Sequence, residues 1–126
     1  MRRIGVVLGL MLGCSSASEP SVETVVVETA RSRYGPSDDI ELTIRNRAAA
    51  AIRYSVCPGT LEHRHDGTWV RSEQLMLCSD DTTLLEGGSS RVEVLRLEGV
   101  ERGEHRVIVR LFAPEGEASS NSFVVE

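Results

Sequence analysis

Residues 38–46 constrain the fold of this chain more than any other stretch. Their side chains alternate between apolar (Ile40, Leu42, Ile44) and polar (Glu41, Thr43, Arg45). A period of two is typical of a β-strand with one buried and one solvent-facing side. Just before them, residues 34–37 form a cluster of turn-favouring residues that contains Gly and Pro. The stretch therefore predicts one strand of a sheet that is exposed to water on one face.

Similar short segments recur along the rest of the chain. They alternate in the same way or are rich in β-branched residues, and turn residues separate them. We expect further strands over residues 24–29, 50–57, 61–65, 68–71, 90–97, 104–112 and 122–126, and a turn over residues 113–119. Seven or eight short strands, with no convincing helix after the N-terminal leader, predict an all-β, antiparallel sandwich.

Turn residues and breaks in the pattern define details of these strands. Pro58-Gly59 is expected to end the third strand, and Asp66-Gly67 predicts a tight hairpin turn. The apolar phase of residues 90–97 slips, which predicts a β-bulge near Val94. The segment from Ser72 to Gly88 loses the alternation, so we expect a long loop there.

The N-terminus has the layout of a bacterial export signal. Arg2 and Arg3 precede an apolar run over residues 4–12 that is too short to span a bilayer. The end of this run, residues 10–14 (LMLGC), resembles the lipobox of bacterial lipoproteins, although Met11 stands where that motif prefers Leu. The resemblance implies a signal peptide over residues 1–13 and a lipid on Cys14 that anchors the protein to a membrane. A plain secretory signal, cleaved elsewhere, is the alternative, and either leader exports the domain.

The residues after the leader indicate a tether followed by one domain. Residues 14–21 are mostly small and polar, which is typical of a flexible spacer. Ser15 follows the cysteine where an Asp would resemble an inner-membrane retention signal, so we expect an outer-membrane lipoprotein facing the periplasm or the cell surface. Residues 22–126 are enough for a single small domain. The net charge of −5 argues against a nucleic-acid partner, which needs a basic surface.

Two cysteines remain besides Cys14. In an exported protein a lone pair is most simply a disulfide, so we predict a bond between Cys57 and Cys78. It would close a loop of about 20 residues and stabilise the fold by about 3 kcal/mol. A two-thiol metal or redox site is the competing interpretation, but such sites use closer cysteine spacing.

Several short motifs resemble those of bacterial immunoglobulin-like domains in exported proteins. These are RYGP at residues 33–36, TIRN at 43–46, YSV at 54–56, GTW at 67–69 and GEHRV at 103–107. The resemblance covers nearly all of residues 22–126 and implies an immunoglobulin-like sandwich, but it is nearly silent on function. A fainter likeness to bacterial immunoglobulin-like proteinase inhibitors implies a role for the loop from Ser72 to Gly88.

A few side chains could carry binding. His63 and His65 should share one face of a strand and could hold a metal if His105, the remaining histidine, came near. A solvated polar strand is the plainer interpretation, and we predict no metal and no other cofactor. Tyr54 is expected in the core. Trp69, the only Trp, is expected either to cover one end of the sandwich or to lie in an interface.

The predicted function follows from the predicted cellular location and the predicted fold. The chain shows neither a nucleophile elbow nor paired carboxylates that can be placed in a cleft, so we predict that it is not an enzyme. We expect a lipid-anchored cell-envelope protein with a binding or structural module, whose partners are the membrane, through Cys14, and an unknown envelope protein. The alternatives are an exported proteinase inhibitor, acting through the loop from Ser72 to Gly88, and a metal-binding envelope protein.

Overall fold

The computed structural model describes residues 21–72, 82–97 and 99–126. Their only helical element is one 3-10 turn, η2 (Val22–Thr24), and no described helix has the length and apolar character needed to cross a membrane. The described strands are β1 (Val25–Thr29), β2 (Arg33–Tyr34), β3 (Asp39–Asn46), β4 (Ile52–His65), β5 (Thr68–Ser72), β6 (Thr83–Leu85), β7 (Ser90–Arg96), β8 (Gly103–Ala113), β9 (Glu115–Ser119) and β10 (Phe123–Val125).

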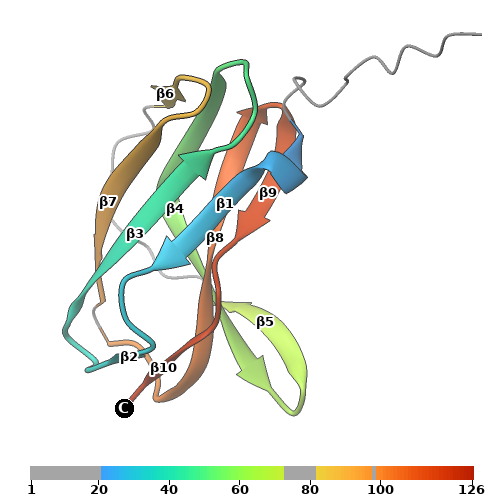
Figure 1. Cartoon of the computed structure of the whole chain (residues 1–126). Coiled ribbons are helices and arrows are strands. Elements are labelled where there is room, and N and C mark those ends of the chain that lie inside the picture. The colour runs from blue at the N-terminus through green and yellow to red at the C-terminus, as the bar shows by residue number, and fades with distance from the viewer. Residues whose placement is uncertain (1–20, 73–81, 98) are drawn as a thin grey trace, which may run out of the picture.

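The strands form two sheets that face each other (Figure 1). A three-stranded sheet has the order β1-β3-β7 and lies in front in this view. The second sheet has the order β2-β10-β8-β4-β5, with β6 paired to β4 and β9 paired to β8. Strand pairs are antiparallel apart from β2 with β10, which run parallel. The predicted all-β sandwich is confirmed.

The core lies between the two sheets, and β3 is at its centre. Ile40, Leu42 and Ile44 of β3 are completely buried, as their alternation predicted. They pack in one cluster with inward side chains of the facing sheet, among them Tyr54, Val107, Val109, Leu111, Phe123 and Val125. Tyr54 is therefore a core residue, as expected. Fully buried Asn46, the last residue of β3, donates hydrogen bonds to the carbonyls of Ala50 (2.9 Å) and Leu85 (3.1 Å).

The expectation that Pro58-Gly59 ends the third strand is wrong. β4 continues from Ile52 to His65 and pairs with β8 along both halves. The register shifts between Ser55, opposite Arg110, and Thr60, opposite Ile108, so β4 carries extra residues at this point. A strand absorbs a chain-breaking Pro-Gly pair where ladder pairing is already interrupted, as in a bulge.

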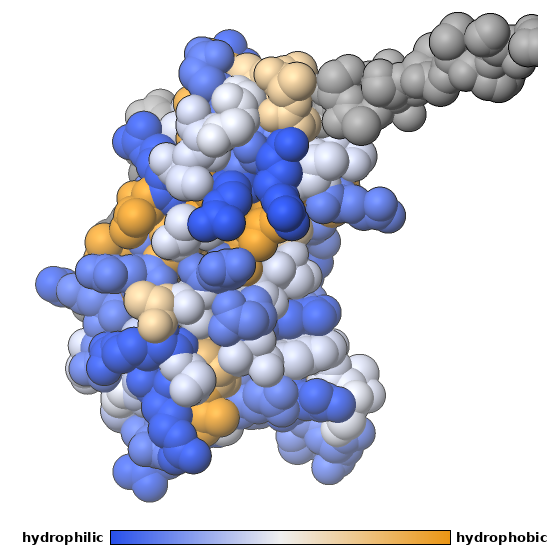
Figure 2. Space-filling model, viewed as in Figure 1, coloured by the Kyte–Doolittle hydropathy of each residue, from blue (hydrophilic) through white to orange (hydrophobic). Residues whose placement is uncertain are grey.

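The bulge predicted near Val94 is also wrong. β7 pairs with β3 residue by residue, from Asp39 with Arg96 to Arg45 with Ser90, without interruption. The apolar phase slips because Val92 and Val94 face solvent, with 56% and 58% of their surfaces exposed, while Glu93 faces inward. Figure 2 shows apolar surface on this side of the molecule, over β7, beside a mostly polar face.

Two segments expected to be irregular contain strands. Residues 115–119 form β9, which pairs along β8, so they are not simply a turn. β6 lies inside the loop expected from Ser72 to Gly88 and pairs with the start of β4. Both strands gain partners only because the neighbouring sheet presents an edge to them, which local sequence does not reveal.

Candidate interaction surface around Trp69

The hairpin of β4 and β5 projects beyond the sandwich (Figure 1). Asp66 and Gly67 form its turn with positive φ angles of 49° and 78°, the backbone that a tight Asp-Gly hairpin requires. The turn fixes the register, which places Glu62 opposite Arg71 and Arg64 opposite Trp69. Residues directly opposite in an antiparallel pair share a face, so this predicted hairpin brings the Glu62–Arg71 charge pair and the Arg64–Trp69 cation–aromatic pair to one side.

Trp69 lies on the outer face of the hairpin, half-buried and away from the core. The guanidinium carbon of Arg106 lies 4.4 Å from the centre of its ring, and that of Arg64 lies 5.6 Å away. Both distances are within the range of cation–π attraction. Trp69 is therefore not part of the core cluster, and its place in an interface stays a prediction.

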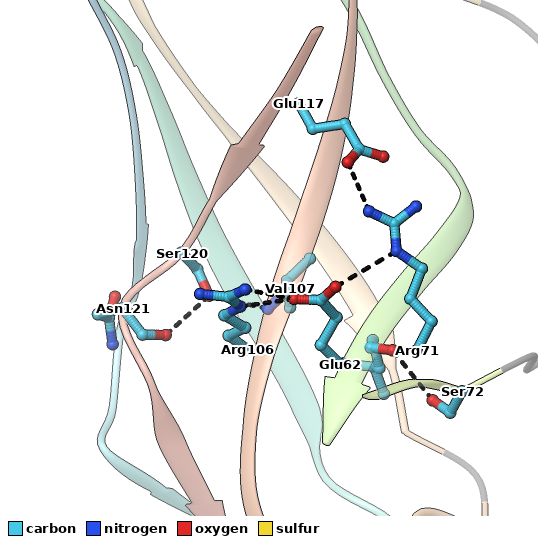
Figure 3. A network of polar contacts seen from close by, with 9 residues as sticks. Glu62, Arg71, Ser72, Arg106, Val107, Glu117, Ser120 and Asn121 are labelled. Carbon is cyan, nitrogen blue, oxygen red and sulfur yellow. Dashed lines mark hydrogen bonds and ion pairs between the residues drawn. The ribbon is translucent and has the colours of Figure 1, made fainter. Parts of the chain in front are cut away.

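Glu62 on β4 links Arg71 on β5 to Arg106 on β8 (Figure 3). Its Oε1 accepts a hydrogen bond from Nε of Arg106 (2.7 Å) and forms an ion pair with Nη2 of the same residue (2.6 Å), and its Oε2 accepts a hydrogen bond from Nε of Arg71 (3.3 Å). Arg71 also donates to Glu117 on β9. The buried carboxylate is thus neutralised by two arginines, as burial of a charge requires.

The ion pairs alter the acidity of the exposed end of this network. The hydrogen bond from Arg71 lowers the pKa of Glu117, and hydrogen bonds to Glu117 and Glu62 raise the pKa of Arg71. Glu104 meets Arg64 at 3.5 Å at the other end. We call Glu62, Arg64, Trp69, Arg71 and Arg106 the Trp69 platform. Ion pairs connect the charged members of the platform to one another or to neighbouring carboxylates.

The inner face of the same hairpin carries histidines. His63 lies directly opposite His105 in the β4–β8 pair, with ring centres 4.9 Å apart, and its ring centre is 6.2 Å from that of His65. His105 is 2% exposed, and its Nδ1–H donates to the carbonyl of Gly103 (3.0 Å). Burial lowers the pKa of His105, against the carbonyl of Gly103, which raises it. His63 therefore neighbours both other histidines, but among the described residues no group of three His, Cys, Asp or Glu side chains could hold a metal ion.

The remaining predicted sites lie outside the described residues. Cys14 and Cys78 are among the undescribed positions, and the side chain of Cys57 on β4 is not described either. The lipid anchor and the disulfide therefore stay predictions. The middle of the loop from Ser72 to Gly88 also lies outside the described residues, so the inhibitor hypothesis stays a prediction. A further open, polar pocket is lined by Ser37, Asp38, Asp39, Arg96 and Leu97, and no sequence signal pointed to it.

The solved structures to which this chain is similar are distant from it. The sequence matches no protein-family model and no curated protein. Among solved structures, a β-glucosidase from Erythrobacter marinus is 16% identical with a TM-score of 0.46, and the match covers 80% of this chain but 15% of the enzyme. The PapD-like domain of human CEP192 is 14% identical with a TM-score of 0.40, covering 98% of this chain and 94% of that one. Spo0M from Bacillus subtilis is 12% identical with a TM-score of 0.42, covering 81% and 47%. Such distant similarities carry no argument about function.

Proposed function

We propose that this chain is an exported, lipid-anchored immunoglobulin-like domain that binds another protein of the cell envelope through the Trp69 platform, without catalysing a reaction. The observation that carries the proposal is the position of Trp69 on the outer side of a projecting hairpin, with two guanidinium groups within 6 Å of its ring centre. Trp and Arg are the residue types most enriched among the side chains that dominate protein interfaces.

Stability of the sandwich does not explain this arrangement. Trp69 contributes nothing to the core cluster, whose members all lie between the sheets or at their ends. A Trp that only filled space would bury its ring against apolar side chains, whereas this ring is covered by two charged groups and remains partly open to solvent. An ordered aromatic surface of this kind lowers the entropy cost of association.

The same network supports a binding role over a catalytic one. Each carboxylate around Trp69 is engaged by arginine: Glu62 by Arg71 and Arg106, Glu117 by Arg71, and Glu104 by Arg64. General acid or base catalysis requires a carboxylate poised to exchange a proton near neutral pH. Carboxylates paired with arginine in this way suit recognition better.

The anchor is tested by purifying the protein from membranes of its own host and measuring its intact mass. We expect a mass that corresponds to Cys14 through Glu126 plus acyl chains, and partition into the detergent phase. The variant Cys14→Ala should lose both. An unlipidated mass for the wild-type chain would contradict the anchor, although it would leave the platform untested by this measurement alone.

The platform is tested by photo-crosslinking in the host. A photoreactive amino acid at Asp66, whose exposed side chain sits at the tip of the hairpin, should trap one envelope protein, and Trp69→Ala should abolish that crosslink. The matched controls use Val94, an exposed apolar residue on the opposite sheet. One control carries the same photoreactive probe at position 94, and the other is Val94→Ala combined with the probe at Asp66. Equal crosslinking from both positions, or no effect of Trp69→Ala, would refute the proposal.

A further inference from the structure

Two histidine rings meet where the projecting hairpin joins the sandwich. His63 of β4 lies directly opposite His105 of β8, and it is the last residue of β4 that pairs with β8. The two residues of β4 that follow it, Arg64 and His65, pair with β5. The ring centres of His63 and His105 are 4.9 Å apart. This contact therefore lies at the base of the hairpin, at the end of the pairing between β4 and β8.

His105 lies in surroundings that disfavour a positive charge. Its ring is 2% exposed, its Nδ1–H donates to the carbonyl of Gly103, and Phe123, opposite on β10, stacks on it with ring centres 6.1 Å apart. Among the described residues, the charged groups that act on this ring are His63 and Glu101. Burial lowers the pKa of His105, and His63 lowers it further, against the carbonyl of Gly103 and the charge of Glu101, which raise it. The closed arrangement therefore favours a neutral His105.

Protonation of His63 would leave one of its ring nitrogens unsatisfied. A protonated imidazole is a donor at both nitrogens, and a buried donor needs an acceptor. Nε2 has a carboxylate nearby, since Oε2 of Glu101 lies 3.6 Å away. Nδ1, the other nitrogen, is buried and has no hydrogen-bond partner among the described residues. The ring packs against Gly103, where an added Cβ would lie 3.3 Å from Cε1 of His63, so the buried nitrogen stays unpaired until the ring moves away.

We propose that the contact between His63 and His105 is an acid-sensitive latch, which holds the β4–β5 hairpin against β8 near neutral pH and releases it when the two rings take up protons. Two imidazolium rings at this separation repel each other. When β4 leaves β8 at His63, both rings reach water and their N–H groups find acceptors there. The end of a strand pairing opens at a lower free-energy cost than the core of a sheet, so the hairpin opens before the sandwich unfolds.

The outer face of the hairpin limits how far it opens. The ion pair between Glu62 and Arg106 joins β4 and β8 one position before His63, on the opposite side of the strand. The strands therefore stay together up to Glu62, and the release moves the part of the hairpin beyond it. The inference does not depend on a partner at the Trp69 platform, because it concerns the other face of the hairpin. Failure of one proposal would leave the other intact.

The direction of the pH dependence follows from the burial of His105. Burial lowers the pKa of His105 in the closed form, so the neutral ring contributes fully to the stability of that form above the ordinary histidine pKa of about 6.5. The contribution is lost as pH falls below this value, because the open form binds the proton more tightly. Each proton taken up on opening raises the ratio of open to closed molecules by about tenfold per pH unit.

The first test is NMR of the full-length protein at about pH 7.5 and about pH 5. Nuclear Overhauser contacts from the ring of His63 to Gly103 and His105 should be present at the higher pH and lost at the lower. The contact between the rings of Tyr34 and Phe123, whose centres are 5.4 Å apart, should persist at both. Persistence of all these contacts would overturn the proposal. Loss of all of them would do so too, because acid would then unfold the whole sandwich.

The fluorescence of Trp69, the only Trp, follows the same event in variants. Its ring centre lies 4.4 Å from the guanidinium carbon of Arg106 on β8, so release of the hairpin should change its emission as pH falls. His63→Phe keeps an aromatic ring beside His105 and removes one titrating group, so the transition should become less steep. The matched control is His65→Gln on the same strand, whose side chain is 70% exposed and whose loss should leave the transition unchanged. A transition equally steep in the wild type and in His63→Phe would contradict the latch.

Discussion

Tyr54 connects the two sheets through the only polar atom of its side chain. The ring is completely buried, and its hydroxyl on β4 donates to Oε1 of Glu93 on β7 at 2.6 Å. Arg91 lies 3.2 Å from the same carboxylate. Burial raises the pKa of Tyr54, and the hydrogen bond to Glu93 and its negative charge raise it further. An inward-facing Glu is therefore tolerated because a hydroxyl from the opposite sheet and a neighbouring arginine satisfy it.

This pair predicts how the stability of the domain depends on alkaline pH. The pKa of Tyr54 is higher in the folded than in the unfolded protein. The contribution of the protonated Tyr54 hydroxyl to the free energy of unfolding is therefore complete below the ordinary pKa of about 10, and it is lost as pH rises above that value. Urea unfolding between pH 8 and 11 should show a decline in stability that is shallower in Tyr54→Phe. Equal slopes in the two proteins would contradict the assignment.

β7 shows how an irregular sequence pattern can belong to a regular strand. Its pairing with β3 is continuous, yet its inward side carries Glu93 and Leu95, and its outward side carries Val92 and Val94. The pattern fails only because an acidic side chain occupies a core-facing position and two valines occupy solvent-facing positions. Exposed valines are common on strands, since β-branched side chains suit the extended backbone even without burial.

The orientation of β7 predicts opposite responses to two neighbouring substitutions. Val94→Thr should change the free energy of unfolding by no more than about 0.5 kcal/mol, because the side chain is exposed. Leu95→Ala should cost about 2–5 kcal/mol, because it leaves a cavity in the core. Denaturant unfolding of the two variants measures both. Comparable losses would indicate that the strand is bulged, as the sequence pattern suggested.

The domain as a whole is a sandwich with one core and one projecting hairpin (Figure 1). The hairpin belongs to the larger sheet, and after the register shift β4 still pairs with β8 as far as His63. This shift changes which positions of β4 face inward, from Ile52 and Tyr54 before it to Leu61 and His63 after it. The hairpin thereby gains an outer face with the Trp69 platform and an inner face with the histidines.

The predicted disulfide bears on the stability of the whole domain. Cys57 lies on β4 within the stretch where the register shifts, and a bond to Cys78 would tie that stretch to the segment after β5. We expect reduction to lower the free energy of unfolding by about 3 kcal/mol. The unfolded, non-reduced domain should contain no titratable thiol apart from an unacylated Cys14. Finding two further thiols would exclude the bond.

Part of the Trp69 platform can be predicted from the sequence. Counting outward from the Asp66-Gly67 turn already pairs Arg64 with Trp69 and Glu62 with Arg71, because a two-residue turn sets the register of its hairpin. Arg106 could not be placed in this way. Its approach to Glu62 depends on how many extra residues β4 inserts against β8, and nothing local specifies that number.

The division between local and long-range information has a physical basis. The alternating residues of β3, β8 and β10 indicated where strands form and which side is buried, because alternation between the two faces of a strand needs no knowledge of its partner. The continuation of β4 through Pro58-Gly59, the inward turn of Glu93 and the meeting of Arg106 with Trp69 arose from packing and pairing. Their free energies depend on side chains from distant strands, so the folded arrangement alone specifies them.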